Sequence, residues 1–70
     1  MRARTTKFAC YDVVELACDI PESGLKQGTR GTVVLVYTRP QEAYEVEFID
    51  GNGASIAVTT AEPEQLKASQ

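Results

Sequence analysis

Gly31-Thr-Val-Val-Leu-Val-Tyr-Thr38 is the stretch of sequence that decides the fold class. Its density of β-branched residues favours a strand and leaves little room for a helix. Strict alternation places Val34 and Val36 on one face of this strand and Val33, Leu35 and Tyr37 on the other. A small sheet buries only one face in its own core. Either a bulge rotates part of the strand and brings both sets inward, or the second set forms an exposed patch.

Further strands are predicted on both sides of this stretch, at residues 11–17, 44–48 and 55–60. In the second of them Tyr44, Val46 and Phe48 alternate with glutamates, so these three side chains are expected to face inward. On the return strand the same reasoning places Ile56 and Val58 inward.

Turn residues separate these strands. Asp50-Gly-Asn-Gly53 predicts a tight hairpin, because Asp-Gly and Asn-Gly both suit positive φ. Pro21 and Gly24 predict a long loop after the first strand, with Ile20 and Leu25 tucked back onto the fold. Residues 62–66 predict one short helical turn, since Pro63 suits a first helical position.

These elements predict an all-β fold, a small SH3-like barrel of four to five antiparallel strands with a short C-terminal helical turn. The glycine pattern Leu25-x-x-Gly28-x-x-Gly31-x-Val33 agrees with a turn that leads into a bent strand. We expect a single domain at residues 11–67, a basic and disordered arm at residues 1–10, and a frayed tail at residues 68–70.

Several segments in order resemble a known family. They are Tyr11-Asp-Val-Val-Glu-Leu16, Asp19-Ile-Pro-Glu-x-Gly-Leu-Lys26, Gly31-Thr-Val-Val34 and Ala43-Tyr-Glu-Val-Glu-Phe48. Together they look like the bacterial family called domain of unknown function 4926, over residues 11–66. The resemblance implies a small SH3-like β fold and no activity. Leu35 departs from the pattern, because we expect a polar residue on the outer side of that strand.

Charge is distributed unevenly along the chain. Residues 1–7 hold three of the seven basic side chains and no acid, and the rest holds four basic against ten acidic residues, a net charge of −6. An acidic body argues against nucleic-acid binding, which requires a basic face. No apolar run follows the basic residues, so neither a signal peptide nor a membrane span is expected and the protein is placed in the cytoplasm.

Catalytic chemistry has little support in this sequence. The chain contains no histidine, the usual general base near neutral pH. Cys10 and Cys18 are too far apart along one extended segment to form a disulfide, so we expect two buried free thiols. Asp50-Gly-Asn-Gly53 lacks the further ligands of a calcium loop. We therefore predict no enzyme activity, no metal site and no cofactor.

The leading functional hypothesis is a protein-interaction module that forms a homodimer. Its motivation is the central strand, which is apolar on both faces in a chain with a small core. The predicted interface consists of Val13, Val33, Leu35, Tyr37, Ile49 and Ala57. Open strand edges offer a second route, including exchange of a strand or terminal segment between two copies.

Two alternatives remain. One is a nucleic-acid-binding SH3-like module, by analogy of fold alone. Its phosphate contacts would come from Lys26, Arg30 and Arg39, together with the basic side chains of the N-terminal arm. The other is an accessory subunit or antitoxin-like partner of a different protein.

Overall fold

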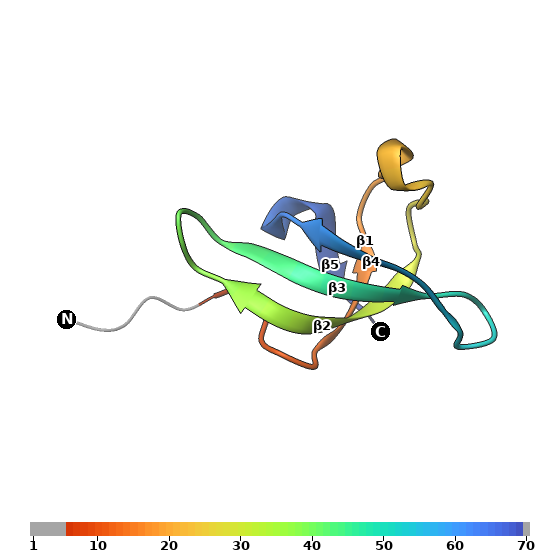
Figure 1. Ribbon diagram of the computed structural model, residues 1–70, viewed down its shortest axis with the longest axis horizontal. Coiled ribbons are helices and arrows are strands. Elements are labelled where there is room, and N and C mark those ends of the chain that lie inside the picture. Colours follow the sequence, from red (N-terminus) through yellow and green to blue (C-terminus); the bar gives the residue numbers. More distant parts are fainter. Residues whose placement is uncertain (1–5, 70) are drawn as a thin grey trace.

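The computed structural model describes residues 6–69 and forms one antiparallel sheet. Its strands run in the spatial order β4-β3-β2-β1-β5, and Figure 1 shows the long β2–β3 hairpin along the molecule. The elements are β1 (Val13–Leu16), η1 (Pro21–Ser23), β2 (Arg30–Tyr37), β3 (Ala43–Ile49), β4 (Ser55–Ala61), η2 (Pro63–Gln65) and β5 (Leu66–Ala68). The predicted all-β class with five antiparallel strands is confirmed. The sheet does not close, however, because β4 and β5 stand at its two ends.

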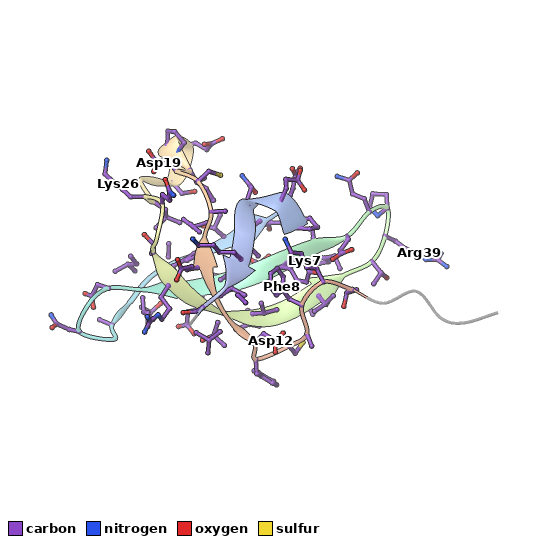
Figure 2. The ribbon with its side chains drawn as sticks, turned by 180° about the vertical axis from the view of Figure 1, so that it is seen from behind. Lys7, Phe8, Asp12, Asp19, Lys26 and Arg39 are labelled. Carbon is purple, nitrogen blue, oxygen red and sulfur yellow. The ribbon has the colours of Figure 1, made fainter. Side chains whose placement is uncertain are left out.

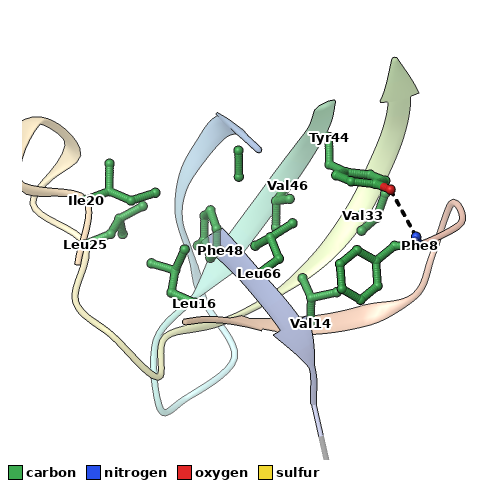
Figure 3. Close-up of a cluster of buried hydrophobic side chains, with 11 residues drawn as sticks. Phe8, Val14, Leu16, Ile20, Leu25, Val33, Tyr44, Val46, Phe48 and Leu66 are labelled. Atoms are coloured by element: carbon green, nitrogen blue, oxygen red, sulfur yellow. Dashed lines mark hydrogen bonds between the residues drawn. The ribbon is translucent and has the colours of Figure 1, made fainter. Parts of the chain in front are cut away.

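The core lies on the concave side of this sheet. Tyr44, Val46 and Phe48 are fully buried, which confirms the alternation predicted for β3. The other core side chains are Phe8, Val14, Leu16, Ile20, Leu25, Val33, Ala61 and Leu66 (Figure 3). Ile20 and Leu25 pair across the η1 loop and both are buried, as expected from the sequence.

A β-bulge in β2 resolves the ambiguity of its two apolar faces. Val33 lies opposite Val46 while Leu35 lies opposite the next residue, Glu45, so Val34 is the extra residue. The bulge shifts the alternation, which places Val33 in the core and lets Val36 pack against it. The prediction that Val33 belongs to an exposed interface is therefore wrong, because its side chain is 0% exposed.

The orientation predicted for the return strand is also wrong. Ile56 and Val58 are 50% and 55% exposed. Ser55 pairs with Ile49 and Ala57 pairs with Phe48, so a second irregularity at Ile56 sets the register. The inward side of β4 is then made of small residues, which fit beside the bulky side chains of β3.

Both ends of the described chain are better ordered than the sequence suggests. Phe8 is buried and Lys7 contacts η2, so the disordered arm is a wrong prediction for these two residues; residues 1–5, with Arg2 and Arg4, lie outside the described part. Ala68 belongs to β5 and the Ser69 N–H donates to the Val13 carbonyl at 3.2 Å, so the frayed tail is wrong there. Gln70 lies outside the described residues.

Candidate interaction surface

The face of the sheet that points away from the core carries most of the exposed apolar side chains, and we call it the outer face. Cross-strand register places its residues in rows. One row runs from Val13 through Thr32 and Glu47 to Val58. The exposed large apolar residues of the sheet are Val13, Val34, Leu35, Tyr37, Ile56 and Val58. The outer face therefore carries apolar side chains on β1, β2 and β4, the apolar margins, and the glutamates of β3 lie between those of β2 and β4.

Glu45 organises the middle of the outer face. It lies opposite Leu35 on β2 and Thr60 on β4. Its Oε1 accepts hydrogen bonds from the Thr60 hydroxyl at 2.9 Å and from the Tyr37 hydroxyl at 3.3 Å. Desolvation raises the pKa of Tyr37, and the negative charge of Glu45 and the hydrogen bond to it raise it further. Tyr37 is therefore a neutral donor that fixes the Glu45 carboxylate between the apolar margins.

The two edges of the sheet differ in chemistry. The β4 edge has the sequence Ser55-Ile-Ala-Val-Thr-Thr-Ala61, which contains neither a charged residue nor a proline. No strand within residues 6–69 pairs with the far side of β4. The β5 edge is three residues long and carries Lys67, whose Nζ lies 3.4 Å from a Glu15 carboxylate oxygen. Of the two edges of the sheet formed by residues 6–69, β4 is therefore the one that offers a long, uncharged row of backbone donors and acceptors.

The predicted interface residues fall into two groups. Val13, Leu35 and Tyr37 lie on the outer face and are exposed. Ala57 packs against the core, and Ile49 is half-buried at the end of β3. The sequence reasoning missed Ile56 and Val58, which stand on the outer side of the β4 edge. Two features of the sequence could have indicated that Ile56 and Val58 point outward. The other residues of β4 are small, and the strand follows a glycine-rich turn in which an irregular residue is easily accommodated.

The three cations predicted to bind nucleic acid are not gathered on one face. Lys26 and Arg30 flank a turn that the Thr29 N–H closes on the Lys26 carbonyl at 3.1 Å. Arg39 lies at the opposite end of the molecule, in the β2–β3 turn (Figure 2). Between them the sheet carries Glu45 and Glu47, so the structure does not join these cations into one basic surface.

An open hollow of about 690 Å³ lies beside Arg30, between the turn at residues 27–29 and the β3–β4 hairpin. Asp50 lines the same hollow. One of its carboxylate oxygens accepts the N–H groups of Asn52 and Ala54 at 2.8 and 3.1 Å. Asp50 therefore shapes the hairpin, and its charge opposes the binding of an anion next to Arg30.

The cysteines occupy positions that the sequence did not predict. Cys10 and Cys18 are both free and exposed, so the expectation that they are buried is wrong. They lie in the bends on either side of β1, where the chain leaves the sheet. Across residues 6–69, no group of three or more cysteine, aspartate or glutamate side chains is arranged to hold a metal ion. In the same region no helix is long and apolar enough to cross a membrane.

Comparison with known proteins identifies one relationship. Residues 10–68 match the model of a family whose description is a domain of unknown function. This range covers the sheet from before β1 to the end of β5. No curated protein and no solved structure matches the chain.

Proposed function

The chain belongs to the DUF4926 family, and we propose that it is a non-catalytic protein-interaction module that associates with a second copy of itself. The observation that carries this proposal is the β4 edge, a seven-residue strand with no partner on one side among residues 6–69. Its outer side chains, Ile56 and Val58, are half exposed. Long apolar edges of this kind are templates for pairing with another chain.

The size of the domain supports the same proposal. Seventy residues bury a smaller fraction of their surface on folding than a larger domain does, so the core alone gives modest stability. Contact with a second copy along β4 would cover part of the exposed Val58 side chain and would add to that stability. The proposal also places the protein in a reducing compartment, the cytoplasm, which suits the free thiols of Cys10 and Cys18.

The concentration dependence of thermal unfolding tests this proposal. If folding is coupled to dimer formation, Tm rises with protein concentration by mass action. We expect a clear upward shift over a roughly hundredfold concentration range. The same Tm at every concentration would contradict self-association.

The alternatives gain no support from the arrangement of side chains. Lys26 and Arg39 lie at opposite ends of the molecule (Figure 2), and Arg30 stands at the start of β2, so nucleic-acid binding remains a prediction from fold analogy. A role as an accessory subunit or antitoxin-like partner likewise remains a prediction.

A further inference from the structure

Within residues 6–69, the edge of β4 lacks the features that protect exposed strands elsewhere. Natural edge strands are commonly short, charged, interrupted by proline or covered by another segment. The β5 edge is short and charged, with Lys67 paired to Glu15. Ser55–Ala61 of β4 is more than twice as long and uncharged. The two edges of one sheet therefore differ in the property that controls pairing with another strand.

The direction of the backbone groups on the sheet follows from one hydrogen bond. The Val33 N–H donates to the Asp12 carbonyl at 3.0 Å, so the backbone groups of Val33 point toward the β1 side. The direction of the backbone N–H and C=O groups alternates from one residue to the next along an antiparallel strand. Those groups of Thr32 therefore point toward β3, where Glu47 lies opposite. The N–H and C=O groups of Glu47 in turn point toward β2.

The same alternation continues across β3 to the edge. Phe48 follows Glu47 and points its backbone groups toward β4, where it faces Ala57. The backbone N–H and C=O groups of Ala57 and Thr59 therefore point toward β3. The same groups of Val58 and Thr60 point away from the sheet, at the open edge. These two residues supply the donors and acceptors that a further strand would bind.

Charge argues against contact between two outer faces. Glu45 and Glu47 lie in the middle of the outer face, between the apolar residues of β2 and β4. Stacking two copies face to face would bring these like charges together and remove them from water. Pairing at the edge leaves both glutamates in solvent. It also brings together only uncharged side chains, including Val58 from each copy.

Resting on the proposed self-association, we infer that β4 pairs antiparallel with β4 of a second copy, about a two-fold axis at Thr59. In this register Val58 lies opposite Thr60 of the second copy, and both residues present free backbone donors and acceptors. The two sheets then continue as one. The interface is isologous, since each copy contributes the same strand to it.

Backbone substitution at the edge separates this arrangement from a face-to-face dimer. Thr60→Pro removes an outward N–H, and proline is tolerated on an edge strand where that N–H faces solvent. Thr60→Val keeps the N–H and removes only the hydroxyl that binds Glu45. Leu35→Glu adds a charge to the outer face, away from the edge.

Light scattering on folded samples of these variants gives the first readout, with folding checked by circular dichroism. We expect Thr60→Pro to raise the dimer dissociation constant by about tenfold or more, while Thr60→Val and Leu35→Glu remain dimeric. A dimer that Leu35→Glu dissociates and Thr60→Pro does not would overturn the edge pairing while leaving self-association intact. A monomeric wild-type chain would overturn the proposed function itself.

Cysteine cross-linking gives a second readout that does not depend on the proline variant folding. The background carries Cys10→Ser and Cys18→Ser, which remove the exposed native thiols. Thr59→Cys then faces its own copy across the axis at the short Cα spacing of a non-hydrogen-bonded pair, within reach of a disulfide. Thr60→Cys is the matched control, since it lies opposite Val58 of the second copy. We expect disulfide-linked dimers from Thr59→Cys and few from Thr60→Cys; the reverse order, or no cross-link in either dimeric variant, would overturn the inference.

Discussion

Gly31 shows at the scale of a single residue how closely β2 and β3 approach each other. A Cβ atom at this position would lie 2.8 Å from the Glu47 carbonyl oxygen and 2.9 Å from Cδ1 of Phe48. The carbonyl belongs to the paired strand and cannot move aside without disturbing the ladder. The glycine predicted to help β2 bend is therefore required by packing.

Replacement of Gly31 by alanine should lower the free energy of unfolding by about 1–3 kcal/mol, because it overpacks a well-filled site. Gly51→Ala is the matched control. Gly51 has open space around its Cβ position and no positive φ, so its change should stay within about 0.5 kcal/mol. Urea denaturation of both variants measures the difference, and equal effects would contradict the packing account.

Tyr44 is the polar residue most involved in the core. Its side chain is fully buried, and its hydroxyl donates a hydrogen bond to a Glu42 carboxylate oxygen. The same hydroxyl accepts the Phe8 N–H at 3.0 Å. Burial raises the pKa of Tyr44 above its ordinary value of 10.0, and the hydrogen bond to Glu42 raises it further.

This raised pKa predicts how stability changes in alkali. The folded protein favours the protonated hydroxyl, so the contribution of Tyr44 is fully present below pH 10 and is lost as pH rises through the folded pKa. Urea titrations on either side of this range should show the wild type losing stability more steeply than Tyr44→Phe, which lacks the ionisable group. Parallel losses in the two proteins would show that Tyr44 does not cause the effect.

At the scale of elements, hydrophobic pattern predicts the strands better than it predicts which way they face. The alternation of β3 is strict, and both its position and its buried side follow from it. In β2 and β4 a single extra residue reverses the alternation, at Val34 and at Ile56. The run Val33-Val34-Leu35-Val36 permits a bulge without locating it, because every choice of the extra residue leaves apolar side chains on both faces.

The segment before β1 is the element that sequence patterning missed. Phe8 packs edge-to-face on Tyr44 with ring centroids 5.4 Å apart. The Lys7 ammonium donates to the carbonyls of Pro63 and Leu66 at 3.2 and 3.3 Å. These contacts tie residues 7 and 8 to β3 and to the η2–β5 segment. A lone aromatic beside basic residues carries no periodic signal, so its burial was not predictable.

Phe8→Ala should therefore lower the free energy of unfolding by about 3 kcal/mol or more, because it empties a buried aromatic site. Tyr11→Ala is the matched aromatic control. Tyr11 is 76% exposed, so its removal should cost about 0.5 kcal/mol or less. Thermal unfolding of both variants provides the comparison. If the Phe8→Ala and Tyr11→Ala proteins were equally stable, the result would contradict the packing of Phe8 in the core and would favour the disordered arm predicted from the sequence.

At the scale of the whole molecule, the proposed function rests on an exposed strand edge and on the outer face of the sheet. The absence of histidine, the usual general base, is the basis for predicting no enzyme activity, and that stays a prediction. The outer face was predicted in part, through Val13, Leu35 and Tyr37. The sequence predicted open strand edges, as in any small sheet, without indicating which strand forms them. Identifying which edge is unprotected required the spatial order of the strands, which places β5 beside β1.

Molar mass by light scattering after gel filtration, across a wide dilution series, tests the central claim of self-association most directly. The account predicts a species of twice the 7.6 kDa chain mass that dissociates only on strong dilution. A single-chain mass at the highest concentrations would contradict it, and would leave the exposed β4 edge and outer face to a different partner.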